Sequence, residues 1–325
     1  MKKVLGMGNA LVDVLARIEH DEILEQLHLP KGSMQLIDTK RYIELSKMIQ
    51  SWPLIKATGG SAGNTILALA NLGAEAGFIG RIGDDEFGRF YKENSLQKGI
   101  DFKQVDGEGV SGVALTFVSP DGQRTFGTHL GVAAELHATH LQAEMFEGYD
   151  FFHIEGYLTQ DHSLIDRALT LATAAGMTTS IDLASYNIVA ADHEFFEYLL
   201  RKVDIVFANE EEAKAFTGKE PEAALDELCG ICKIAVVKVG AKGSLIGQGA
   251  ERVVVPARKV TPIDTTAAGD FFAAGFLYGL AKGYRLQQCG EIGTLLASEV
   301  LQVMGTVLTD DTWLRIRSEV ARYES

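Results

Sequence analysis

Short apolar runs alternate with longer amphipathic stretches along most of this 325-residue chain, and this alternation constrains its fold more than any other feature. Several of the longer stretches end just before a glycine, such as Gly73, Gly99 or Gly176, which readily takes the left-handed conformation that follows a helix. Strands that alternate with helices form βαβ units, so the pattern predicts an α/β fold: a doubly wound, mostly parallel sheet covered on both faces. We expect its strands at residues 4–7, 76–79, 150–154, 178–181, 204–207 and 234–239, and helices at 62–72, 86–98, 163–175, 269–282, 286–304 and 311–322.

Two stretches early in the chain break this rhythm. Residues 14–18 and 34–37 read as strands with a short helix between them, and residues 111–118 and 124–128 read as a hairpin that turns at Pro120-Asp121-Gly122. They could form a small second sheet that acts as a lid, or they could be ordinary peripheral hairpins; the pattern alone leaves both open. We expect a single domain, 1–325, with a lid made by residues of approximately 14–50 and 104–130.

Charge and cysteine content exclude several classes of partner. The chain has 30 Lys and Arg against 44 Asp and Glu, a net charge of −14, and no basic stripe, which argues against nucleic acid and anionic membranes. No apolar run approaches the roughly 18 residues of a membrane span. With three cysteines the chain is not a disulfide scaffold, and the Cys229–Cys232 pair has no second pair to complete a zinc site. We therefore expect a cytoplasmic protein with a small-molecule partner, either a monomer or a homodimer.

The segment 263–272, Ile-Asp-Thr-Thr-Ala-Ala-Gly-Asp-Phe-Phe, is the most informative motif. Small residues at Ala267, Ala268 and Gly269 open a very apolar helix, and unhindered N–H groups at a helix start can bind an anion. Asp270 would lie in the first turn, where a carboxylate can take a proton from a hydroxyl while the N–H groups hold a transferred phosphoryl group. The alternative is that Asp270 only stabilises the helix dipole, and the spacing does not decide between the two.

A second cluster, Gly59 to Asn64, supports three interpretations. It matches G-x-S-x-G, the nucleophile elbow of serine hydrolases, with Ser61 as nucleophile. No histidine follows His193, however, and only one clear strand of the main sheet precedes Ser61, so the hydrolase is a distant alternative. The cluster could instead be a hinge at Gly59 and Gly60 whose helix presents Asn64 to a ligand, or a plain flexible loop.

Two further clusters follow predicted strands. Asn209 and Glu212 have the spacing of a helix capping box, and carboxylates at a strand-to-helix junction can also hold Mg²⁺ through water. Gly240 and Gly243 follow the strand that contains Lys238, in a tight turn that could approach a nucleotide or be an ordinary β-turn. The chain lacks a P-loop, a dinucleotide-binding G-x-G-x-x-G and a protein-kinase catalytic loop, so a kinase here would be of another type.

In combination these clusters resemble the ribokinase (PfkB) carbohydrate kinase family. The two signatures lie in residues 59–64 with 80–88 and in residues 264–270, and residues 8–13, 207–212 and 240–243 also match, in the right order along nearly the whole chain. Residues 29–34, 122–125 and 155–158 resemble the adenosine-kinase-like branch. The late motif commonly reads Gly-Ala-Gly-Asp, whereas this chain has Ala267, whose methyl group requires a compatible backbone angle.

The resemblance implies an ATP-dependent kinase with a small β-sheet lid. It would transfer the γ-phosphoryl group to a hydroxymethyl group of an adenosine-like nucleoside or, alternatively, of a free sugar such as ribose, fructose or 2-keto-3-deoxygluconate; a non-catalytic metabolite sensor is a third class. Leu36, Phe117 and Phe126 would then contact the base or form the lid's own core. By position the resemblance assigns Asp270 as catalytic base, Ala267, Ala268 and Gly269 as anion hole, Asp13 and Asn64 to acceptor hydroxyls, and Gly59 and Gly60 to the hinge. It also assigns Asn209, Glu212, Lys238, Gly240 and Gly243 to ATP and Mg²⁺, and Asp264 to a monovalent cation such as K⁺.

Overall fold

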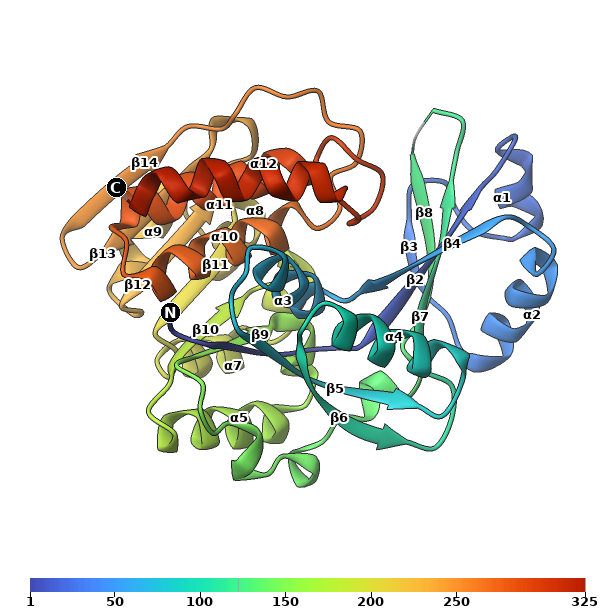
Figure 1. Cartoon of the computed structure of the whole chain (residues 1–325), viewed down its shortest axis with the longest axis horizontal. Coiled ribbons are helices and arrows are strands. Elements are labelled where there is room, and N and C mark those ends of the chain that lie inside the picture. The colour runs from blue at the N-terminus through green and yellow to red at the C-terminus, as the bar shows by residue number, and fades with distance from the viewer. Residues whose placement is uncertain (122, 325) are drawn as a thin grey trace.

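A nine-stranded sheet forms the centre of the protein, whose computed structural model describes residues 1–121 and 123–324 (Figure 1). Its order is β14-β13-β12-β11-β10-β9-β1-β5-β6, and the strands are parallel from β6 across to β12. β13 and β14 complete one edge as antiparallel neighbours. The strands are β1 (Val4–Met7), β5 (Ala76–Gly83), β6 (Asp101–Gly107), β9 (Phe151–Glu155), β10 (Thr178–Asp182), β11 (Ile205–Asn209), β12 (Ile234–Lys238), β13 (Ser244–Gln248) and β14 (Glu251–Val255).

The strand order reverses between β1 and β9. The chain runs from β1 through β5 to β6, then returns to β9 on the other side of β1 and continues through β10 and β11 to β12. Doubly wound sheets bind ligands in the crevice outside the carboxyl ends of the strands at such a reversal. The topology therefore points to the ends of β1 and β9 as the place for a site.

Helices cover both faces of the sheet, as the alternating pattern predicts. Two apolar cores result, one on each face. α10 lies almost wholly inside the first core, where Phe271 and Phe276 are fully buried, and this explains why its sequence is so apolar. The first face carries α3 (Ser61–Asn71), α4 (Glu86–Gln97), α10 (Ala268–Lys282), α11 (Leu286–Val300) and α12 (Asp310–Val320); the second carries α5 (His162–Ala174), α6 (Tyr186–Ala191), α7 (His193–Leu200), α8 (Glu210–Thr217) and α9 (Pro221–Cys229).

A five-stranded sheet, the second sheet, stands beside the main one with its helices on the outer side (Figure 1). Buried side chains of its helix α2, including Tyr42 and Leu45, join the apolar core beneath the strands. Its order is β3-β8-β7-β2-β4, and its elements are β2 (Leu11–Arg17), β3 (Met34–Leu36), β4 (Leu54–Gly59), β7 (Gly112–Val118), β8 (Arg124–His129), α1 (Glu22–Gln26) and α2 (Thr39–Ile49).

The boundaries of the second sheet differ from those expected from the sequence. β4 joins it as an edge strand although it lies beyond the range 14–50, and residues 104–107 belong to β6 of the main sheet. β4 was missed because its six residues carry little apolar character and gain their place by pairing with β2. The turn predicted at Pro120-Asp121-Gly122 includes Gly122, which lies outside the described residues.

The chain passes between the two sheets at several points, one of which requires glycine. Gly60 links β4 to α3 with a φ of 85°, and a Cβ there would lie 2.1 Å from the carbonyl oxygen of Asn9 on the neighbouring crossing. The two crossings therefore touch through their backbones. Within the described residues, no helix is long and apolar enough to cross a membrane.

Candidate active site

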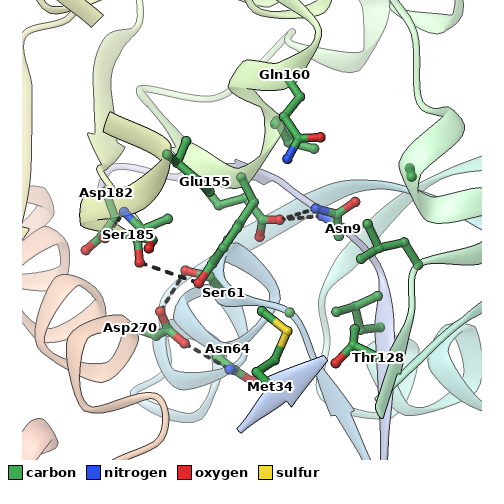
Figure 2. A pocket seen from close by; sticks show the side chains of 18 of the residues that line it. Asn9, Met34, Ser61, Asn64, Thr128, Glu155, Gln160, Asp182, Ser185 and Asp270 are labelled. Atoms are coloured by element: carbon green, nitrogen blue, oxygen red, sulfur yellow. Dashed lines mark hydrogen bonds between the residues drawn. The ribbon is translucent and has the colours of Figure 1, made fainter. Parts of the chain in front are cut away.

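A cavity of about 980 Å³ lies between the carboxyl edge of the main sheet and the second sheet. Polar side chains from five adjacent strands of the main sheet line it, because parallel strands end at the same edge. Figure 2 shows several of these side chains converging on the cavity. The polar side chains from the five strands are Asn9, two residues after β1, and the last residues of β9 to β12: Glu155, Asp182, Asn209 and Lys238.

Asp270 lies in the first turn of α10, and two side chains from α3 hold its carboxylate (Figure 2). The Ser61 hydroxyl donates to Oδ1 at 2.7 Å, and Nδ2 of Asn64 donates to Oδ2 at 2.9 Å. Burial raises the pKa of Asp270 to about 7, although both hydrogen bonds favour the charged form and oppose this shift. Oδ1 of Asn64 is buried without a partner, so it can accept a hydrogen bond from a ligand hydroxyl.

The start of α10 brings backbone N–H groups to the cavity, although the N–H of Ala268 donates to the Thr265 carbonyl oxygen at 3.4 Å. Ala267 caps the helix with a φ of 60°, a left-handed conformation that few residues with a Cβ adopt. Ala267 and Gly269 both line the cavity. The first N–H groups of a helix have no partner within it, so this end can bind an anion.

Lys238 brings a positive charge to the same place. Its Nζ lies 2.7 Å from Oδ2 of Asp182, and a Cβ on Gly269 would be only 3.0 Å from that Nζ. Burial by itself would lower the pKa of Lys238, but the carboxylates of Asp182 and Glu212 raise it above its ordinary value. The ammonium group therefore stays charged beside the start of α10.

Asn209 and Glu212 form the capping box that their spacing predicts. Oδ1 of Asn209 accepts from the Glu212 N–H at 2.8 Å, and Oε2 of Glu212 accepts from the Asn209 N–H at 2.8 Å. Both residues also line the cavity, so capping and ligand binding do not exclude each other here. Burial, with the nearby charge of Asp182, raises the pKa of Glu212 to about 7.

The acidic residues of the site suit a magnesium ion that arrives with phosphates. Among the described residues, no group of three or more His, Cys, Asp or Glu side chains could hold a metal ion unaided. Mg²⁺ usually binds one or two carboxylates together with substrate phosphates and water, and Asp182 and Glu212 can supply such carboxylates.

Sequence reasoning gave no site role to Glu155 or Asp182. Oε1 of Glu155 accepts from the N–H and from Nδ2 of Asn9, at 2.9 and 2.7 Å, and its Oε2 accepts from the Ala62 N–H at 2.9 Å. Glu155 thereby ties β1 and α3 to the end of β9. Each missed residue directly follows a strand expected from the sequence, at 150–154 and 178–181, so the position after a buried parallel strand is the signal that could have found both.

The second sheet supplies the other wall of the cavity. Asp13 of β2 lines it, and burial raises the pKa of this carboxyl to about 6. Leu36 and Phe126 line it as expected, but Phe117 does not: it is fully buried, edge to face with Trp52. Neighbouring residues of a strand point to opposite faces, so only one side of β7 can face the cavity. The apolar residues that line the cavity from the second sheet are Leu11, Met34, Leu36 and Phe126; Leu130 and Leu136 line it from the segment after β8, and Tyr157 from the segment after β9.

Three of the expected glycine positions have reasons that involve no ligand: packing at Gly59 and Gly243, and a positive φ at Gly240. A Cβ on Gly59 would lie 2.7 Å from Oδ2 of Asp13, so this glycine makes room for that carboxylate. Gly243, with a φ of 107°, would place a Cβ 2.0 Å from the carbonyl oxygen of Val255, and Gly240 has a φ of 54°. Neither Gly240 nor Gly243 is among the residues that line the cavity.

The cation site expected at Asp264 does not match the contacts of that carboxylate. Nη1 of Arg124 lies 2.5 Å from its Oδ2, and both side chains are buried. Arg124 reaches this carboxylate from the second sheet, 140 positions away in the sequence, so the spacing around Asp264 could not indicate this partner.

Comparison with known proteins identifies clear relatives of this chain. A family model described as pfkB family carbohydrate kinase matches residues 38–313. The crystal structure of adenosine kinase from Sinorhizobium meliloti matches with a TM-score of 0.85 and 35% identity, over 100% of this chain and 99% of that one. A probable sugar kinase from Rhizobium etli matches with a TM-score of 0.87 and 33% identity, over 98% of this chain and 99% of that one. Adenosine kinase of Schizophyllum commune is 26% identical over 332 residues, which cover 93% of this chain and 96% of that protein.

Proposed function

The chain belongs to the pfkB family of carbohydrate kinases, and on that basis we propose that its acceptor is a purine nucleoside, phosphorylated on the 5′-hydroxyl. As a kinase of this family it is a phosphotransferase that acts on an alcohol group of a nucleoside or sugar, with ATP as donor and typically with Mg²⁺.

The apolar wall that Met34 and Leu36 of β3 and Phe126 of β8 give the cavity is the observation that carries the proposal. Met34 and Leu36 expose 53% and 61% of their surface, although the second sheet has its own core on the other face. A free sugar is polar all round and gains little from such a wall, whereas a purine has two apolar faces. A buried aromatic ring system removes on the order of 100 Å² or more from water, which at about 25 cal/mol per Å² contributes roughly 2–3 kcal/mol.

Polar groups elsewhere in the same cavity suit the ribose of a nucleoside. The Asp13 carboxylate can accept hydrogen bonds from two neighbouring hydroxyls, and the unpartnered Oδ1 of Asn64 can accept another. Asn64 also donates to Asp270, so a hydroxyl group held there lies next to the proposed base.

The end of the cavity at Lys238 and the start of α10 suits the phosphates of ATP. We assign Lys238 and the N–H groups of Ala267 and Gly269, which line the cavity, to the phosphates, together with the N–H of Ala268 between them. Asn209 and Glu212 line the cavity too, and we assign Gly240 and Gly243, in the turn after Lys238, to ATP as well. Mg²⁺, when bound, neutralises part of the phosphate charge. Asp270 takes the proton of the attacking hydroxyl, and the helix N–H groups stabilise the charge on the phosphoryl group in transfer.

The second sheet is proposed to act as a lid that moves at Gly59 and Gly60. Closure would exclude water, which competes with the acceptor for the phosphoryl group. A cytoplasmic location agrees with three cysteines that are all free. A monomer or homodimer without nucleic-acid partners stays a prediction.

A panel of acceptors tests the proposal by ADP release at sub-saturating concentration. Adenosine or a related purine nucleoside is expected to exceed ribose, fructose and 2-keto-3-deoxygluconate in kcat/KM by about tenfold or more. A tenfold ratio corresponds to roughly 1.4 kcal/mol of additional binding free energy from the base. A free sugar that outperforms every nucleoside would leave the kinase in place and overturn the nucleoside assignment. Binding without ADP release would favour a sensor, and ester hydrolysis that Ser61→Ala abolishes without ATP would favour a hydrolase.

A further inference from the structure

A buried ion pair joins the second sheet to the segment that precedes α10. Arg124 of β8 and Asp264 meet at 2.5 Å, with only 5% and 4% of their side chains exposed. Asp264 stands three residues before Ala267, the cap of α10, so the pair lies directly behind the proposed anion hole.

Three donors of the protein bind the carboxylate of Asp264. Its Oδ1 accepts from the Thr266 N–H at 2.9 Å. Its Oδ2 accepts from the Gly305 N–H at 2.8 Å and from Arg124. The single negative charge is thus balanced by a guanidinium group, and the two N–H donors hold the segments around residues 266 and 305 against it.

A monovalent cation does not fit this arrangement. A potassium ion needs oxygen ligands with free lone pairs, and here Oδ2 of Asp264 already accepts from two donors and Oδ1 from one. It would also stand beside a buried guanidinium group, and like charges repel strongly where water is excluded. The group that faces Asp264 is therefore a cation that the chain itself provides.

We propose that Arg124 takes the place of a monovalent cation, so that the second sheet delivers the positive charge that orders the segment leading into the anion hole. Arg124 then acts as a positioning residue through Asp264, and phosphoryl transfer needs no added K⁺. The guanidinium group also lies over the ring of Phe126 at 4.9 Å, and Phe126 lines the cavity. A ligand that contacts the Phe126 ring would thereby hold Arg124 in place. Acceptor binding would then be coupled to the ordering of the segment that leads into the anion hole.

This inference rests on the proposed anion hole. The decisive measurement is of thermal stability and needs no turnover, so a failure of the Arg124 inference can be told apart from a failure of the proposed anion hole. The melting temperature of the wild-type protein is measured in about 0.1 M KCl and in choline chloride of equal ionic strength. The two values are expected to agree within roughly 1 °C, since only a bound cation would stabilise the folded state specifically. ADP release in K⁺-free buffer is expected to stay within about twofold of the rate in KCl, below the fivefold at which coupling between sites usually begins.

The Arg124→Gln variant gives the complementary result. It leaves the buried carboxylate of Asp264 without a countercharge, so its melting temperature is expected to fall in choline chloride and to recover in part when K⁺ is added. Arg124→Lys, which keeps the charge, is expected to show little response to K⁺. Arg17→Gln removes an exposed arginine from β2 of the same sheet and is expected to behave as the wild type in both salts.

Two outcomes would overturn the proposal. The first is a wild-type protein that K⁺ stabilises specifically by several degrees, or activates about fivefold or more. The second is an Arg124→Gln variant that folds but ignores K⁺, which would make the pair an ordinary ion pair rather than the substitute for a cation. Where Arg124→Gln does not fold, the wild-type comparison can still overturn the proposal, because a specific response to K⁺ would show that a cation binds.

Discussion

Ser61 donates its hydroxyl group to Oδ1 of Asp270 at 2.7 Å, across 209 positions of the sequence. The bond joins the two glycine-rich motifs, because one opens α3 and the other opens α10. Asn64, one turn further along α3, holds the second oxygen of the same carboxylate. Ser61 is thus a partner of an acidic residue, which accounts for the G-x-S-x-G pattern without a nucleophilic serine.

The pH dependence of kcat/KM should report on Asp270. Burial raises the pKa of Asp270 to about 7, and a general base works only when ionised, so activity should rise with pH around a midpoint near 7. The Ser61 hydrogen bond favours the charged form, so Ser61→Ala should move the midpoint to higher pH. The measurement is kcat/KM from pH 5 to 9 for both proteins; a midpoint near 4 in the wild type would contradict the role of Asp270.

The Asp270→Asn variant should lose catalysis and keep ATP binding. A lost general base costs about 10²-fold or more in kcat, whereas the N–H groups that hold phosphate are unchanged. Titration calorimetry with ATP and steady-state kinetics measure the two effects. Near-normal kcat would remove Asp270 from the mechanism.

The same variant should be more stable than the wild type at high pH. With a raised pKa, Asp270 contributes stability below its unfolded pKa of 3.8, and this contribution is lost as pH rises through about 7. At pH 8 the wild type therefore has a buried charge that the neutral amide of the variant lacks. At pH 8, urea unfolding should then give Asp270→Asn a free energy of unfolding that is higher than that of the wild type by on the order of 1–2 kcal/mol. The difference should be smaller at pH 5. A difference that grows towards low pH would contradict the assigned shift.

Substitutions at the two strained backbone positions should act in opposite directions. Ala267 has a φ of 60°, so Ala267→Gly removes a strain of about 1–2 kcal/mol and should raise the free energy of unfolding by up to about 1 kcal/mol with activity retained. Gly60→Ala should instead destabilise the protein and raise the acceptor KM, because its Cβ would meet the Asn9 carbonyl oxygen at 2.1 Å. Urea unfolding and acceptor kinetics of both variants measure this; an unchanged Gly60→Ala protein would exclude a tight hinge.

Two exposed apolar residues of the second sheet offer a matched test of the acceptor wall. Leu36 and Ile55 are 61% and 62% exposed, but only Leu36 lines the cavity. Leu36→Ser should raise the KM for a purine nucleoside several-fold, because the lost apolar contact removes roughly 1 kcal/mol of binding free energy. Ile55→Ser should leave this KM unchanged. Equal effects of the two substitutions would show that the wall does not contact the acceptor.

Much of the fold could be predicted from the sequence because it depends on local periodicity. The strand at Val4–Met7 and the expected helix at 163–175 agree with β1 and α5 to within a residue. Doubly wound topology follows from alternating strands and helices, whereas β4 is held by pairing with β2 rather than by its own apolar pattern. A strand of that kind is not visible in its own residues.

The candidate site could be predicted only where a motif carries its own geometry. Asp270 and the small residues before it belong to one helix start, so their sequence spacing already sets their arrangement. Glu155 and Asp182 come from separate strands, so only their positions at the strand ends indicate the site, and their contacts depend on how the strands assemble. Phe117 illustrates the same limit, because the side of a strand that faces a ligand depends on the partner sheet.

The sequence by itself determined the α/β architecture and the motifs for phosphate and proton transfer, since these depend on periodicity and on backbone groups a few residues apart. The tertiary structure decided which distant side chains meet, as with Arg124 and Asp264 or Ser61 and Asp270. It also decided the pKa of Asp270, because burial depends on every element that covers the carboxylate. Charge balance and desolvation are properties of the assembled site, and the chain acquires them only when its two sheets close around the same cavity.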